Sequence, residues 1–190
     1  MKNENVLKQG RSVFVRRTIF IIIGSVVIAG AVVTGGLYTY KALTKDPVSI
    51  IESTSGYAKD TDKNNKFIEI KEVDAEPVEE EFPVDISEEA VQHAIHSMSH
   101  QKVKADKKWG FLPMTQERIQ RLTEVVKQKD YKHGKLYLDI LEGWSQSDFS
   151  DADADHNAIW DLQGGTIGEA TGVLSLEEEK AFIEKYYDIE

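Results

Sequence analysis

Residues 18–40 read TIFIIIGSVVIAGAVVTGGLYTY, a run of 23 residues without a charged side chain. As a helix that rises 1.5 Å per residue, this run is about 35 Å long, so it can cross a hydrocarbon core of about 30 Å. It also lacks the polar positions, about 3.6 residues apart, that mark a soluble amphipathic helix. The run therefore predicts one transmembrane helix.

Charged residues differ on the two sides of this span. Residues 1–45 carry seven Lys or Arg side chains and one Glu, whereas the rest of the chain carries 16 bases and 32 acids. Because Lys and Arg gather on the cytoplasmic side of a membrane, residues 1–17 are predicted to be a cytoplasmic tail and the C-terminal part to lie outside the cell. The Ala-x-Ala pattern at residues 29–31 lies inside the span, so we expect an uncleaved signal anchor rather than a cleaved signal peptide.

Composition excludes several classes of function. The chain has no Cys, so disulfides, thiolate nucleophiles, cysteine zinc sites and a lipid-bearing cysteine are all excluded, and the helix itself is the expected anchor. The formal net charge of −10 opposes nucleic-acid binding, which depends on Lys and Arg at phosphates. Small residues four apart in the span allow close approach of two helices, which makes a homodimer through the transmembrane helix a further hypothesis.

Residues 41–86 combine prolines with acidic clusters. Three of the four Pro residues and the run Glu79-Glu80-Glu81 fall here, and apolar residues are sparse. Such a segment buries too little apolar surface to offset the entropy of ordering, and its charges repel one another. We therefore predict an extended acidic stalk, in which only residues 67–73 show the alternation of a short edge strand.

Repeated helix-start signals follow residue 86. Four hydroxyl side chains that can cap a helix precede apolar residues at helical spacing; they are Ser87, Thr115, Ser150 and Ser175. A further helix is indicated by apolar residues at i, i+3, i+4 and i+7 from Tyr137 to Trp144. Residues 87–190 are therefore predicted to form a small domain of about five short helices, and the whole fold to be mainly α. The expected core residues are Trp144, Ile159, Leu162, Phe182 and Ile183.

Acidic residues alternate at Asp151, Asp153 and Asp155, as they do at the first ligand positions of a calcium loop. The rest of that motif is missing, because its sixth position is His156 rather than Gly and its twelfth is Leu162 rather than Glu. In the first turn of a helix the same acids would complement the helix dipole. We favour the helix interpretation, and calcium is the alternative cofactor.

Three histidines, His93, His96 and His100, share one face of the first predicted helix of this domain. An i, i+4 pair of histidines can hold zinc, but a zinc site needs further ligands that the sequence does not place. A solvated polar face is therefore the favoured interpretation.

The neighbouring Asp155 and His156 raise the question of general-base catalysis. Adjacent residues of a helix do not face each other, so Asp155 is not expected to orient the ring of His156. We predict instead that His156, Asn157 and Gln163 fasten the glycine-rich loop that follows by hydrogen bonds.

The segment at residues 109–114, WGFLPM, brings four large apolar side chains together where Gly and Pro oppose a helix. It is interpreted as a connection that covers the core, or as a hydrophobic surface for a partner protein. The residues concerned are Trp109, Phe111, Leu112 and Met114.

The stretch 144–174 carries the densest group of unusual residues: Asp155, His156, Asn157, Trp160, Gln163, Gly164, Gly165, Thr166 and Gly168. This stretch resembles an uncharacterised family of single-pass membrane-anchored proteins from Bacillus and relatives. The resemblance implies a Gram-positive host and an extracytoplasmic location, and it implies no catalytic role for any residue.

Together these features predict a single-pass protein of the bacterial cell membrane with a non-enzymatic interaction or regulatory domain outside the cell. Its expected partner is another envelope protein. The alternative is a cation-binding module or metal-dependent envelope enzyme that uses Asp151, Asp153, Asp155 and His156.

Overall fold

Alternating apolar residues build the first two strands. This computed structural model describes residues 47–54, 66–73 and 75–189. In it, β1 (Pro47–Thr54) and β2 (Lys66–Glu72) pair antiparallel, with Ile50 opposite Ile70. At the other end of the chain, β5 (Asp188–Ile189) pairs in parallel with β1, so the order in this sheet is β2-β1-β5.

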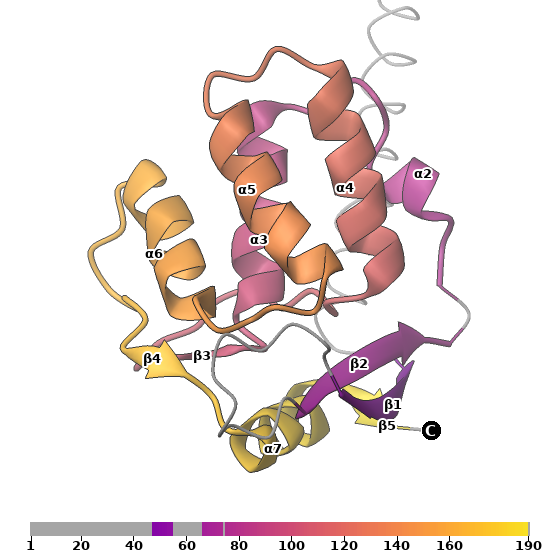
Figure 1. Cartoon of the computed structure of the whole chain (residues 1–190), viewed down its shortest axis with the longest axis vertical. Coiled ribbons are helices and arrows are strands. Elements are labelled where there is room, and N and C mark those ends of the chain that lie inside the picture. The colour runs from indigo at the N-terminus through magenta and orange to yellow at the C-terminus, as the bar shows by residue number, and fades with distance from the viewer. Residues whose placement is uncertain (1–46, 55–65, 74, 190) are drawn as a thin grey trace, which may run out of the picture. The chain divides into compact units, whose positions relative to one another are not determined.

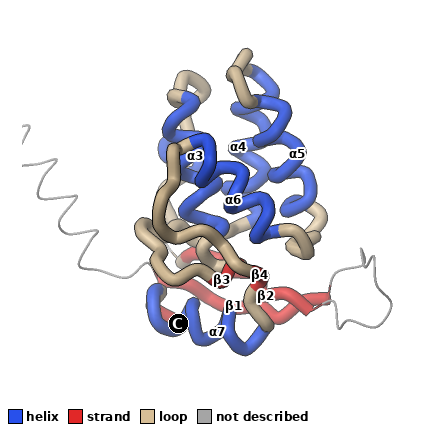
Figure 2. Tube along the Cα trace, turned by 90° about the vertical axis from the view of Figure 1, so that its left-hand side faces the viewer, coloured by secondary structure: helices blue, strands red, loops and turns tan. Residues whose placement is uncertain are grey.

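One face of this sheet is covered by the last helix, α7 (Leu176–Tyr186). Their shared core consists of Val48, Ile68, Ile70, Phe182, Ile183 and Tyr187. The strands lie between α7 and the remaining long helices (Figure 2). Burial of these side chains joins the beginning of the described chain to its end.

The larger part of the domain is helical (Figure 1). Its helices are α2 (Val78–Glu81), α3 (Glu88–Ser99), α4 (Gln116–Gln128), α5 (Gly134–Ser145) and α6 (Ala152–Leu162). Two short strands, β3 (Val103–Lys104) and β4 (Gly172–Val173), pair antiparallel beside α6. The mainly α prediction is confirmed for the described residues, in which helices predominate over short strands.

Local capping chemistry sets most helix starts as predicted. The Ser87 hydroxyl accepts from the backbone of Ala90 at 3.1 Å, and the Thr115 hydroxyl accepts from that of Arg118 at 3.2 Å. Ser175 forms the full capping box with Glu178. The prediction for α6 is wrong by one residue, because Asp151 rather than Ser150 is its N-cap.

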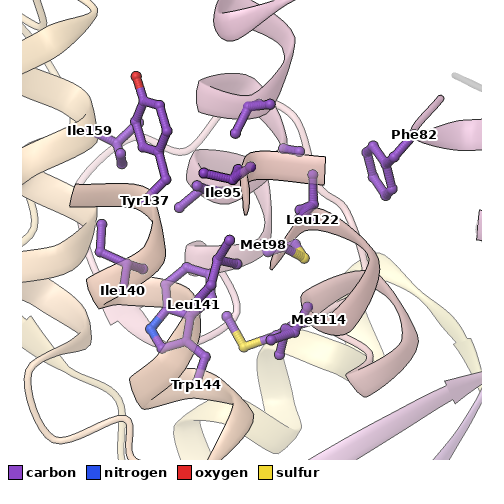
Figure 3. Packing of buried hydrophobic residues seen from close by; sticks show 14 residues of the cluster. Phe82, Ile95, Met98, Met114, Leu122, Tyr137, Ile140, Leu141, Trp144 and Ile159 are labelled. Atoms are coloured by element: carbon purple, nitrogen blue, oxygen red, sulfur yellow. The ribbon is translucent and has the colours of Figure 1, made fainter. Parts of the chain in front are cut away.

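The helical core lies among α3, α4, α5 and α6. Figure 3 shows Ile95, Leu122 and Trp144, from three different helices, pointing into the same interior. Trp144 and Ile159 are buried here as predicted, whereas Phe182 and Ile183 are buried in the sheet core instead. Leu162 is only half-buried. The expected single core is therefore divided between two clusters.

The predicted acidic stalk at 41–86 is wrong for its described residues. These residues form β1, β2 and α2, and a compact unit begins at Asp46. Arg118 forms ion pairs with both Glu72 and Glu81, so two of the acids that were expected to repel one another share one cation. The apolar partner of the hairpin is α7, more than 100 residues later, so local composition does not show it.

The predicted transmembrane helix at residues 18–40 and the tail at 1–17 lie outside the described residues. Within the part of the chain that the structure describes, no helix combines the length and apolar character needed to cross a bilayer.

A buried ion pair joins the sheet to the helical part. Lys102 Nζ lies 2.5 Å from Glu179 Oε1, and the two side chains are 3% and 7% exposed. The same ammonium donates to the carbonyl of Ile68 in β2 at 3.1 Å, and Gln101 Nε2 donates to Glu179 at 2.9 Å. Burial lowers the pKa of Lys102, while the nearby Glu179 charge acts to raise it.

We predict that Lys102→Met destabilises the fold by about 3–5 kcal/mol, because it leaves the Glu179 carboxylate buried without its cation. The matched control is Lys104→Met two residues along. Lys104 pairs with Glu178 at 2.8 Å, but both side chains are about half exposed. Lys104→Met should therefore lower the free energy of unfolding much less than Lys102→Met does. Urea unfolding of both variants measures the difference, and equal losses would contradict the assignment.

Candidate functional site

Three histidines from two helices converge where α3 packs against α6. His96 lies in the last turn of α3, His100 is the C-cap residue of that helix, and His156 lies on α6. Their ring centroids are 4.8 Å apart for His96 and His100, 4.5 Å for His96 and His156, and 5.3 Å for His100 and His156. One ligand atom from each ring lies within 4.8 Å of the others. We call these three residues the histidine cluster.

The predicted solvated face of His93, His96 and His100 is wrong for two of its members. His93 is exposed, but His100 is buried and His96 is half-buried. The reason is that α6 covers this side of α3 and contributes His156, which is fully buried. His156 is thus the third histidine that the spacing on α3 does not supply.

Hydrogen bonds determine the tautomers of the two histidines on α3. His96 Nδ1 lies 2.5 Å from Gln163 Oε1, and His100 Nδ1 lies 2.7 Å from the carbonyl oxygen of Gly110. Because these oxygens only accept, both Nδ1 atoms carry the proton. The Nε2 atoms of His96 and His100 therefore carry lone pairs.

His156 makes its two hydrogen bonds on opposite sides of the ring. Its Nε2–H donates to the carbonyl of Gly168 at 3.2 Å, and its Nδ1 lies 2.9 Å from Ser99 Oγ. Ser99 Oγ is also 2.6 Å from the carbonyl oxygen of His96. A hydroxyl has a single proton, so Ser99 can donate either to His156 or to His96.

Burial keeps all three rings neutral at pH 7. It lowers the pKa of His100 to about 3 and that of His156 to about 4, and it also lowers the pKa of His96. Lys108 adds to this effect at His100 and His156, because its ammonium donates to the carbonyl of His100 at 2.9 Å. The site therefore presents uncharged imidazoles.

The cluster holds two loops that touch each other. Gly110, held by His100, and Gly168, held by His156, both have positive φ, at +78° and +91°. A Cβ at Gly168 would lie 2.6 Å from the carbonyl oxygen of Lys107, so this loop passes directly against the other.

The two most exposed large apolar side chains of the described residues lie on these loops. Trp109, which precedes Gly110, is 65% exposed, and Ile167, which precedes Gly168, is 55% exposed. Each is thus one residue away from a carbonyl that a buried histidine holds. We call Trp109 and Ile167 the apolar pair.

Other side chains of α6 fasten the glycine-rich loop. Asn157 exchanges two hydrogen bonds with the backbone of Ala170, at 2.9 and 2.7 Å. The Trp160 indole donates to the carbonyl of Ile167 at 2.9 Å. Loop fastening by His156 and Asn157 is confirmed, whereas Gln163 contacts His96 instead of the loop. Gly164 and Thr166 are exposed, and Gly165 lies against the Trp160 ring.

Of the apolar segment at 109–114, only Trp109 remains on the surface as a large apolar side chain. Phe111 stacks on Tyr186, with ring centroids 4.0 Å apart. Leu112 and Met114 pack in the helical core. The segment therefore mostly covers the core, and its exposed residue points to a smaller surface than the four residues suggest.

The acidic residues of α6 do not converge on the histidine cluster. Asp155 Oδ2 accepts from the Trp144 indole at 2.9 Å, and burial raises the pKa of Asp155 to about 6. Asp151 is the N-cap of α6, and Asp153 lies in its first turn. In the described ranges these carboxylates do not form a group with metal-ligand spacing, whereas the three histidines do. Calcium binding by the acids stays a prediction.

Residues 95–184 match the model of DUF6241, a family of unknown function. The DUF6241 match begins in α3 and ends in α7, so it includes the whole histidine cluster and both loops but leaves out β1 and β2. It supports the resemblance to an uncharacterised family. No curated protein and no solved structure matches the chain.

We predict that Gly165→Ala destabilises the domain more than Gly164→Ala. A Cβ at Gly165 would lie 2.1 Å from the Trp160 ring, so the indole must leave its place against Ile167. Gly164 has open space around it and only the strain of φ +68°, which costs about 1–2 kcal/mol. Urea unfolding gives the free energies, and the Trp160 indole N–H resonance reports the displacement. An unchanged Trp160 resonance in Gly165→Ala would contradict this packing.

We also predict that the metal-free domain loses stability between pH 7 and pH 5. His100 and His156 have pKa values of about 3 and 4 in the folded state, whereas an unfolded histidine has about 6.5. The unfolded chain therefore binds more protons in this range, and stability falls as the pH falls. Asp155, with its raised pKa of about 6, acts in the opposite direction but is a single group.

Urea unfolding at the two pH values, with a chelator present, measures this dependence. His156→Gln should reduce the pH dependence, and the exposed His93→Gln should leave it unchanged. Equal stability at pH 7 and pH 5 would mean that the cluster does not need to be neutral.

Proposed function

We propose that this chain is a single-pass membrane-anchored protein whose extracytoplasmic domain is a non-enzymatic interaction module of a Gram-positive cell envelope. The apolar run at 18–40 and the basic residues that precede it support the anchor and its direction. The match to a family of unknown function agrees with the resemblance from which the host and location are inferred.

The observation that carries the interaction role is the apolar pair. An exposed Trp and an exposed Ile lie on two loops that meet at Gly168 and Lys107, and both present apolar surface to water. Tryptophan in particular is enriched among the residues that contribute most to protein–protein binding. The pair is therefore the proposed contact with a partner.

The loops are already fastened before any partner binds. Hydrogen bonds from His100, His156 and Trp160 hold the backbone beside Trp109 and Ile167. A surface that is fixed in advance loses less conformational entropy on binding. Histidines that hold backbone carbonyls in this way support a positioning role rather than a catalytic one.

Charge near the apolar pair suggests the kind of partner. The exposed Lys107 lies two residues before Trp109, whereas Lys108 turns its ammonium to the carbonyl of His100. A basic side chain close to an exposed Trp in the sequence suits an envelope protein that has an apolar cleft bordered by acidic residues. For the cation-binding alternative, the group with metal-ligand spacing contains His156 together with His96 and His100, and not Asp151, Asp153 and Asp155.

We predict that a photo-crosslinking residue at Trp109 or Ile167 forms an adduct with one envelope protein in intact cells. Val84 is the matched control, because it is also exposed, at 46%, but belongs to a different connection, between α2 and α3. Trp109→Ser should remove the adduct formed from position 167. The same adducts from position 84 would contradict a partner surface at the apolar pair.

The membrane placement has a separate test. A C-terminal alkaline phosphatase fusion should be active, because this enzyme folds outside the cytoplasm, and the chain should stay in the membrane fraction after alkaline carbonate extraction. Exchange of the basic residues before the span for acidic ones should reduce phosphatase activity. An inactive fusion, or release by carbonate, would contradict the anchor or its orientation.

A further inference from the structure

We propose that His96, His100 and His156 bind a first-row divalent transition metal, with Zn²⁺ as the expected ion, through the Nε2 atoms of the three rings. This inference concerns the interior of the domain and does not depend on the partner surface or on membrane placement.

The arrangement of the three rings is close to that of a metal site. Their ligand atoms lie within 4.8 Å of one another. In tetrahedral zinc coordination, with Zn–N distances of about 2.0–2.1 Å, ligand nitrogens are about 3.3 Å apart. The three ligand atoms therefore have to approach one another by up to about 1.5 Å when the ion binds. His96 and His100 already have the i, i+4 spacing by which one helix supplies two zinc ligands.

The type of donor selects the metal. All three ligands are neutral imidazoles, which suit Zn²⁺, Ni²⁺ and Cu²⁺. Calcium and magnesium need oxygen ligands, and no carboxylate belongs to this group within the described residues. The positive charge of Lys108 near His100 and His156 weakens binding of any cation, so the affinity has to come from the three imidazole nitrogens.

The outer hydrogen bonds of the two α3 ligands have the pattern that metal-bound histidines show. Each donates its Nδ1–H to an oxygen: His96 to the amide of Gln163 and His100 to the carbonyl of Gly110. Such a bond orients the ring and directs the Nε2 lone pair toward the ion. Metal binding at these two residues therefore requires no change of protonation.

His156 can adopt the same tautomer because of Ser99. When the Ser99 hydroxyl donates to the carbonyl of His96, 2.6 Å away, its oxygen is free to accept from His156 Nδ1–H at 2.9 Å. The proton then moves from Nε2 to Nδ1 of His156 by exchange with solvent, with no net change. His156 Nε2 then gives up its hydrogen bond to the carbonyl of Gly168 and binds the ion. That hydrogen bond is long, at 3.2 Å.

The amide that orients His96 is itself only partly satisfied. Gln163 Nε2 is buried and makes no hydrogen bond to the described residues, although the Oε1 of the same amide contacts His96. A buried donor without an acceptor is costly. His96 is only half-buried, which gives the ion a path from solvent.

The test uses the untagged full chain in detergent, stripped of metal and titrated with Zn²⁺, Co²⁺ and Ca²⁺. We expect one Zn²⁺ per chain, a higher melting temperature with Zn²⁺, visible d–d absorption of tetrahedral Co²⁺, and no effect of Ca²⁺. His96→Gln should weaken Zn²⁺ binding at least tenfold, whereas His93→Gln on the exposed side of α3 should change it less than twofold. No stoichiometric binding, or an equal effect of His93→Gln, would overturn the proposal.

A measurement on the unmodified chain keeps the test independent of whether the variants fold. Long-range ¹H–¹⁵N spectra of the five histidines should show Zn²⁺-dependent shifts at Nε2 of His96, His100 and His156, and none at His93 and His133. Shifts confined to His93 or His133 would show adventitious surface binding and overturn the site. Gln163→Met should weaken Zn²⁺ binding about 10–100-fold, as loss of an outer hydrogen bond does; unchanged affinity would refute the positioning role of Gln163.

Discussion

The buried ammonium of Lys102 connects the parts of this domain. It lies against Glu179 of α7, donates to the carbonyl of Ile68 in β2, and sits 4.1 Å from the centre of the Phe149 ring, between α5 and α6. A buried charge is tolerated only where its pair and its hydrogen bonds are in place. This requirement forces the sheet, the last helix and the helical core into one arrangement.

That arrangement also sets the position of the histidine cluster. Lys102 follows His100 by two residues, so the end of α3 is held where α6 can pack against it. The histidines lie between the two helices and the two loops, and each ring makes a hydrogen bond to a residue of another segment. The proposed partner surface and the proposed metal site share this architecture. A metal that draws His156 away from Gly168 would remove one hydrogen bond from the loop that carries Ile167, while those from Trp160 and Asn157 remain.

Features that depend on neighbours in the sequence were predictable. Ser87, Thr115 and Ser175 cap their helices through contacts within three residues, which a short pattern is sufficient to reveal. The stalk prediction was wrong because it used only local composition, whereas the buried apolar residues of β1 and β2 pack against α7, more than 100 residues later. The third histidine of the cluster was not predicted for the same reason. His156 belongs to the stretch with the most unusual residues, but it lies 60 residues from His96 in the sequence, so no local pattern predicts their contact.

By itself, the sequence determined the mainly α character of the domain, the helix caps, the absence of cysteine chemistry and an apolar run of transmembrane length, because these depend on composition and on short-range spacing. The tertiary structure alone decided that acidic residues expected in a stalk belong to the folded unit, that the expected core residues are divided between separate clusters, and that histidines 56–60 residues apart meet in one cluster. The physical reason is that burial, ion pairing and ring contacts are made between surfaces. Which surfaces face each other follows from the packing of α3, α6 and α7 rather than from any segment alone.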